Sequence, residues 1–222
     1  MATPASLVPA PRDGHSIGFN LGVIALAVAL GGLGLAYLID GAERSRHGAG
    51  PVRGLVARTL GSTTLELPAE WMTEPADGSA GFSKQVDFSV TLPLGPDEAL
   101  RTVDVTLTQR SRVRPSASLL DGVYLHQFLP EQLSGPVGLV GKPMVASEGY
   151  ANETVWYDPI APQPFVAKCA APIADGQAGK CLRTVYLGSG IAAIYSFGDD
   201  VLPNWKRFDA QMHPLLDQIG AL

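Results

Sequence analysis

The sequence predicts an α+β protein, in which an antiparallel sheet with flanking helices follows a single N-terminal transmembrane helix. Three observations carry this prediction: a long uncharged apolar run, strand-like alternation in the middle of the chain, and an amphipathic pattern at its end. The predicted segments are an N-terminal tail (1–16), a transmembrane helix (17–39), a flexible linker (40–54) and an α+β globular domain (55–222).

The bulk composition limits the kinds of partner that the chain can bind. Of its 222 residues 46% are hydrophobic, which is enough to build a core of ordinary size. The net charge is -5, and the 16 Lys and Arg residues do not gather in one long stripe. Because nucleic acid is bound through concentrated positive charge, a nucleic-acid partner is disfavoured.

The apolar run covers residues 17–39 and contains no charged side chain. As a helix it has a length of roughly 35 Å, which is enough to cross a bilayer. A cleaved signal peptide is the alternative, but its apolar region is shorter and ends in a small-x-small site. Here the run is longer and Asp40 follows it, so the pattern favours an uncleaved anchor.

Small residues recur at four-residue spacing along this run, which lets a second helix approach closely within a membrane. These positions are Gly18, Gly22, Ala25, Ala29, Gly32 and Ala36. They predict a packing partner, either another transmembrane helix or a membrane protein complex. The alternative is that Gly and Ala are frequent in membrane spans and in this chain as a whole.

The orientation of the predicted helix is open, because two signals disagree. Arg44, Arg46 and Arg53 follow the run and Arg12 precedes it, so the positive-inside rule favours a cytoplasmic C-terminal domain. The two cysteines favour the opposite orientation, as described below. Residues 40–54 themselves show no periodicity and are typical of a flexible linker.

The globular domain begins with strand patterns. The segments QVDFSVTLPL and RTVDVTLTQ alternate apolar and polar residues, which is typical of strands with one buried face. The turn-forming PLGPDEALR lies between them, so they are predicted to pair as a hairpin. Further strands are predicted around Met144–Glu148, Thr154–Asp158, Phe165–Cys169, Cys181–Leu187 and Ile191–Phe197.

Two helices are predicted. The first begins at Ser118 and ends before Pro130. The second is capped by Asp199 or Asp200 and runs to the C-terminus, with a kink just before Pro214. Its apolar stripe consists of Trp205, Phe208, Met212, Leu215, Leu216 and Ile219.

The two cysteines of the chain, Cys169 and Cys181, have eleven residues between them. A zinc site needs four ligands and a thioredoxin-like site needs C-x-x-C, and neither pattern is present. The cysteines lie on two predicted strands, so a disulfide is predicted if their Cα atoms approach within about 4.4–6.8 Å. Such bonds persist outside the reducing cytosol, whereas two buried thiols in a cytoplasmic domain are the alternative.

No catalytic, cofactor or metal site is predicted. Ser189 lies in LGSGI, which lacks the glycine spacing of a nucleophile elbow and is better explained by a hairpin turn. His126 and His213 lie in different predicted helices, without a partner at metal-ligand spacing. Helix capping explains the carboxylate pair Asp199–Asp200.

The order of these elements resembles the PsbP-like fold, which includes the extrinsic PsbP proteins of photosystem II and several bacterial envelope proteins. The resemblance rests on LELPAEW at 65–71, on paired strands, a middle helix and further strands, and on a final helix with Trp205 and Phe208. It implies a sandwich of antiparallel sheet and helices that binds a larger complex and performs no catalysis.

These observations favour a non-catalytic accessory or assembly subunit of a bacterial membrane complex. The expected location is the inner membrane, with a single span, contact with the lipid bilayer and the C-terminal domain in the periplasm. Two alternatives remain open. One is an anchored envelope hydrolase that uses His126 or the Asp199–Asp200 pair, and the other is a ligand-binding module with an apolar cavity.

Overall fold

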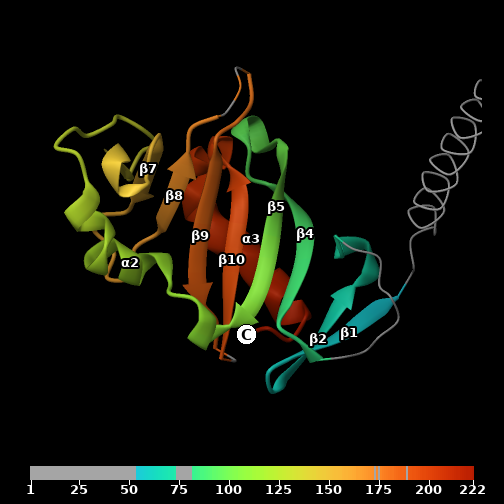
Figure 1. Cartoon of the computed structure of the whole chain (residues 1–222). Helices are drawn as coiled ribbons and strands as arrows, with labels where there is room; N and C mark the ends of the chain where they lie inside the picture. The colour runs from blue at the N-terminus through green and yellow to red at the C-terminus, as the bar shows by residue number, and fades with distance from the viewer. Residues whose placement is uncertain (1–53, 74–81, 173, 175, 189) are drawn as a thin grey trace, which may run out of the picture. The chain divides into compact units, whose positions relative to one another are not determined.

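The computed structural model describes residues 54–73, 82–172, 174, 176–188 and 190–222 (Figure 1). The chain divides into two units, Met1–Gly50 and Pro51–Leu222. The described residues belong to the second unit.

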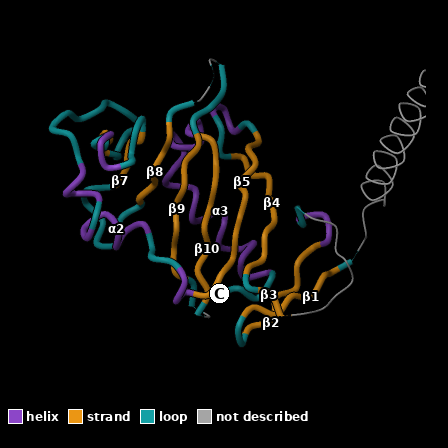
Figure 2. The backbone as a smooth tube through the Cα atoms, in the orientation of Figure 1, coloured by secondary structure: helices purple, strands orange, loops and turns teal. Residues whose placement is uncertain are grey.

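The main element is a seven-stranded antiparallel sheet with the order β4-β5-β10-β9-β8-β7-β6 (Figure 2). Its strands are β4 (Gln85–Pro93), β5 (Leu100–Gln109), β6 (Val140–Pro143), β7 (Glu153–Tyr157), β8 (Val166–Ala170), β9 (Lys180–Tyr186) and β10 (Ile191–Gly198). The predicted hairpin is confirmed as β4 and β5, in which Val90 pairs with Val103. The period-two alternation therefore indicated both the strands and their buried face.

A smaller sheet has the order β2-β1-β3. Its strands are β1 (Leu55–Leu60), β2 (Thr63–Pro68) and β3 (Phe82–Ser83). Gly61 has a φ of 63°, which suits the tight turn between β1 and β2. Leu65 and Leu67 of β2 are fully buried, and the amide of Glu66 donates to the carbonyl of Ile219. The small sheet thus joins the same hydrophobic core as the main sheet.

Two α-helices, α2 (Ser116–Gly122) and α3 (Trp205–Gln218), cover opposite faces of the main sheet (Figure 1). Alternate residues of β8 show this arrangement, because successive side chains of a strand point to opposite faces. Ala167 and Cys169 belong to the core cluster that contains Phe208 of α3. Val166 belongs to a second cluster, with Leu120 of α2.

Phe208 is the centre of the main core. It has no solvent exposure, and its ring lies 4.9 Å from that of Phe197 and 5.3 Å from that of Tyr195, between ring centroids. Phe165 contacts it from a third side, at 6.2 Å. The apolar stripe predicted from the sequence is therefore buried on the sheet, with Met212 and Leu216 one and two turns further along α3.

The predicted fold class is wrong. The described residues form a mostly β structure, with a seven-stranded and a three-stranded sheet, and contain two α-helices. The helical spacing after Ser118 does not extend to Pro130, because α2 ends at Gly122 and a 3₁₀ turn, Tyr124–Gln127, follows it. The α+β sandwich expected from that spacing is replaced by a broad sheet with limited helical cover.

Other boundaries also differ from the predictions. The strand expected around Met144–Glu148 lies earlier, as β6 (Val140–Pro143). The last helix begins at Trp205, because Asp199–Asn204 forms a 3₁₀ helix. Pro214 lies within α3, which continues through it to Gln218. The strands predicted around Thr154–Asp158, Phe165–Cys169, Cys181–Leu187 and Ile191–Phe197 are confirmed as β7, β8, β9 and β10.

The predicted localisation, in the inner membrane with a single span, is not upheld and is corrected here. No helix among the described residues is long and apolar enough to cross a membrane. The segment 17–39 lies outside the described residues, as do almost all of the predicted linker and the tail. The proposed packing positions also lie outside them: Gly18, Gly22, Ala25, Ala29, Gly32 and Ala36.

Replacing Gly141 with alanine is expected to lower the free energy of unfolding by about 1–3 kcal/mol. Gly141 faces Trp156 across the β6–β7 pair, and an added Cβ would lie 2.4 Å from the indole ring. The ring and the strand must therefore move apart. Urea denaturation measures the loss. Gly122→Ala is the matched control, because a Cβ at Gly122 meets no atom within 4 Å. Equal midpoints for the two variants would contradict the prediction.

Candidate functional site

A groove opens in the main sheet where β8 separates from β9. The two strands pair over three positions, from Ala170↔Lys180 to Lys168↔Leu182, although β9 continues to Tyr186. The opening has a volume of about 690 Å³. We call it the β9 groove, and its walls are the start of α2, the second half of β9 and one face of α3.

Arg183 is the buried charge in the wall of the β9 groove. It is 6% exposed, and its Nη2 donates to the carboxylate of Asp209 on α3 at 2.6 Å. The guanidinium also lies over the ring of Phe165, with its carbon 4.4 Å from the ring centroid. Its Nε is buried and has no hydrogen-bond partner among the described residues. Buried donors are normally paired, so Arg183 has unused binding capacity.

Tyr195 lies opposite Arg183 on β10 and also lines the groove. Burial raises the pKa of its phenol above the ordinary value of 10.0 because the charged form loses hydration. The carboxylate of Asp209 raises this pKa further, and the positive charge of Arg183 partly offsets both effects. Tyr195 is therefore a neutral hydroxyl group throughout the physiological pH range.

The raised pKa of Tyr195 predicts a loss of stability at high pH. Between the unfolded pKa of about 10 and the higher folded pKa, the unfolded chain loses this proton and the folded chain keeps it. The free energy of unfolding is thus expected to keep the Tyr195 contribution below about pH 10 and to lose it progressively as the pH rises above that value. Urea denaturation between about pH 8 and 11 measures the fall, and Tyr195→Phe should make it shallower. An equally steep fall in that variant would disprove the assignment.

The mouth of the groove is held in place by hydrogen bonds from β9 to the connection between β5 and α2. The Tyr186 hydroxyl donates to the carbonyl of Val113, and the Thr184 amide donates to Oγ of Ser116, both at 2.9 Å. The guanidinium of Arg110 lies 4.1 Å from the centroid of the Tyr186 ring. The connection is therefore fixed beside the C-terminal end of β9.

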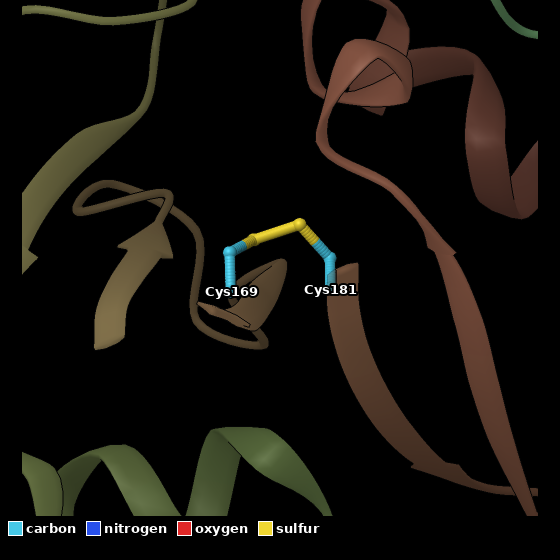
Figure 3. The surroundings of a disulfide bond; sticks show 2 residues. All are labelled: Cys169 and Cys181. Atoms are coloured by element: carbon cyan, nitrogen blue, oxygen red, sulfur yellow. A yellow bond between two sulfur atoms is a disulfide. The ribbon is translucent and has the colours of Figure 1, made fainter. Parts of the chain in front are cut away.

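The predicted disulfide between Cys169 and Cys181 is confirmed (Figure 3). The two residues face each other across β8 and β9, with their Cα atoms 3.9 Å apart, closer than the expected range. Their pair lies next to Lys168↔Leu182, the last pair before β8 leaves β9. The bond therefore fixes the end of the strand pairing at which the β9 groove begins.

The residues of the predicted hydrolase do not gather in one site. His126 is exposed on the 3₁₀ turn after α2, and His213 lies on α3 in the β9 groove. Asp200 forms an ion pair with Arg101, outside that groove. Among the described residues, no hydrogen bond joins His213 to a hydroxyl group of the groove, and no group of three or more His, Cys, Asp or Glu is placed to hold a metal ion.

Sequence reasoning missed the Arg183–Asp209 pair, although one signal was available. In KCLRTVYL, Arg183 occupies the same strand face as Cys181 and Val185, which is the face covered by α3. A charged side chain on the buried face of a strand destabilises the fold unless it has a partner of opposite charge. Asp209 supplies that partner from α3, and the sequence pattern gave no means of locating it.

No family model matches this chain, and no curated protein matches it. Its fold is similar to the solved structure of Smlt3025, an immunity protein of the Stenotrophomonas maltophilia type IV secretion system. The TM-score is 0.50, with 75% of this chain and 93% of that chain covered, and the sequence identity is 13%. At this identity the likeness shows a shared fold. The resemblance to the PsbP-like fold stays a prediction.

Proposed function

We propose that the domain formed by the described residues is a non-catalytic binding module that acts by occupying the surface of a partner protein. The observation that carries the proposal is the fold similarity, which extends over 93% of the chain of an immunity protein. Colicin nucleases and their immunity proteins form some of the tightest protein complexes known. One fold hosts many functions, so the site must supply further support.

The β9 groove supplies that support through its composition. It is lined by Arg110, Arg183, Tyr186, Tyr195 and Met212, and Arg, Tyr and Met are enriched in protein interfaces. Tyr and Arg are also frequent among the residues that contribute most binding energy. Arg110 and Tyr186 are solvent-accessible and offer a guanidinium group and an aromatic ring to a partner, whereas Arg183, Tyr195 and Met212 are buried. Hydrogen bonds hold the wall that carries Tyr186 in place.

The disulfide supports a place of action outside the reducing cytosol, because such bonds form and persist in oxidising compartments. The proposed partner is therefore a protein in an oxidising environment. A membrane complex as the partner is not part of the proposal.

A small-molecule-binding module is the second candidate, favoured by the volume of the β9 groove. At about 690 Å³ it lies within the range of 300–1,000 Å³ that is usual for ligand sites. The buried Arg183 beside neutral Tyr195 would then select a small anionic ligand. The experiment below separates the two candidates, because a small ligand brings no second chain.

The test is gentle purification of the tagged full chain from its own cells, followed by mass spectrometry of the chains that accompany it. The expected result is one protein in stoichiometric amount, which forms the same complex again when both purified chains are mixed. A cell extract that carries the tag alone is the control. Recovery of the chain by itself, with no protein that reconstitutes a complex, would contradict the proposed function.

A further inference from the structure

A basic segment adjoins the β9 groove, which its first residue Arg110 lines, in a chain whose net charge is -5. Arg110, Arg112 and Arg114 lie within five residues, between β5 and α2, and all three are exposed. Lys84 of the neighbouring β3–β4 connection is also exposed, and its carbonyl accepts a hydrogen bond from Nη1 of Arg112 at 3.4 Å. We call these four residues the basic rim.

The positive charge of the basic rim is unbalanced. Within the described part of the chain, no ion pair joins any of its four residues to a carboxylate. Other exposed cations have such partners, for example Arg207 with Glu98 at 2.9 Å and Lys180 with Asp104 at 3.6 Å. The rim therefore presents unpaired cations to solvent, which is the complement of an acidic surface.

The backbone that carries the rim arginines is held at both ends, which reduces the entropy lost on binding. The amide of Arg110 donates to the carbonyl of Gly190 at 3.0 Å, which ties the start of the segment to the β9–β10 turn. The Tyr186 hydroxyl and the Thr184 amide hold Val113 and Ser116, as described above. Figure 1 shows the connection from β5 to α2 passing the end of β9.

The groove beside the rim is divided by charge. On the α3 side Asp209 is paired with Arg183, whereas Arg110 and the start of α2 lie on the other side. The pair on the α3 side is balanced in charge, whereas Arg110 makes the α2 side positive, so an acidic group is attracted to the α2 side. The space available is a groove about 690 Å³ in volume, which suits an extended chain segment better than a double helix.

We propose that the basic rim and the adjoining side of the β9 groove dock an extended acidic segment of the partner protein, with carboxylates paired to Arg110, Arg112 and Arg114. This inference rests on the proposed function and adds to it the chemistry of the partner. A duplex nucleic acid offers anionic charge as well, but the net charge of -5 on the chain opposes a polyanion.

The test begins with a phage-displayed library of random peptides, panned against the full chain carrying an N-terminal tag. The expected result is a selected set rich in Asp and Glu. The best peptide and its Asn/Gln counterpart are then synthesised with a fluorescent label and titrated by anisotropy. The amide counterpart should bind at least about tenfold more weakly, because each carboxylate–guanidinium pair is lost.

Two matched triple variants locate the binding site. Arg110→Gln, Arg112→Gln and Arg114→Gln together should weaken the acidic peptide about tenfold. Lys180→Gln, Lys206→Gln and Arg207→Gln change the net charge equally at other positions and should leave the affinity within about twofold. Circular dichroism and the melting temperature establish that both variants are folded. A labelled DNA duplex is titrated in parallel and should bind more weakly than the acidic peptide.

Four results would overturn the inference: no selected peptides, selected peptides without acidic residues, equal effects of the two triple variants, or tighter binding of the duplex. Because the library needs no natural partner, these results are independent of the capture experiment. A reconstituted complex that is insensitive to the rim variant would leave the proposed function standing and remove the acidic segment from it. Peptide binding without any captured partner would show that the rim accepts acidic peptides and would contradict the proposed function.

Discussion

Replacing Phe208 with alanine is expected to lower the free energy of unfolding by about 3–5 kcal/mol. Its ring has no solvent exposure and contacts the rings of Phe165, Tyr195 and Phe197. Removal of the ring leaves a cavity between α3 and the sheet, at the point where one helix covers the centre of a broad sheet. Urea denaturation followed by circular dichroism measures the loss.

Gln218→Ala is the control for this prediction. Gln218 is exposed at the end of α3, so its truncation should change the free energy of unfolding by less than about 0.5 kcal/mol. If Phe208→Ala costs no more than Gln218→Ala, then α3 is not packed on the sheet through Phe208, and the described core is wrong.

Removal of the disulfide is expected to cost about 3 kcal/mol, because the bond closes a short loop in the unfolded chain. Cys169 and Cys181 are separated by 12 positions, and the strand pairing beside them extends over only three positions. The double variant Cys169→Ala with Cys181→Ala should therefore unfold at a lower urea concentration than the oxidised chain. It should also bind a partner less tightly, since the bond fixes the strand end at which the β9 groove opens.

A reductant gives the control for the disulfide. It should lower the unfolding midpoint of the wild-type chain and leave that of the double variant unchanged. Thiol labelling of untreated cells tests the oxidation state in vivo. Cys169 and Cys181 should not react with the thiol label until a reductant is added. Freely labelled thiols in untreated cells would contradict the oxidising compartment.

The parts of the fold that the sequence predicted correctly are those with a strong local period. The hairpin β4–β5 alternates over its whole length, and the stripe through Phe208, Met212 and Leu216 marks the buried side of α3. The strands β1 and β2 of the small sheet were not predicted separately, and LVARTL in β1 lacks a regular alternation of apolar and polar residues. The fold class was wrong because helical spacing after Ser118 is ended by Gly122.

The site depended on tertiary structure and was less predictable. The disulfide followed from two cysteines on neighbouring strands, and the pairing confirms it. The β9 groove exists because β8 and β9 pair over only three positions. No local pattern in the sequence indicates where this pairing stops. The three arginines of the basic rim stand together in the sequence as RSRVR at 110–114, but their relation to the groove required the contacts of Tyr186 and Thr184.

Hydrogen–deuterium exchange of the full chain, alone and with the captured partner, tests the central claim most directly. If the domain binds a protein through the β9 groove and its basic rim, amide exchange should slow in residues 110–118 and 183–188, which form its α2 side and its β9 wall. Residues 85–91 of β4, at the far edge of the sheet, should exchange as before. Slowing confined to β4, or absent throughout, would contradict a binding module that works through this groove.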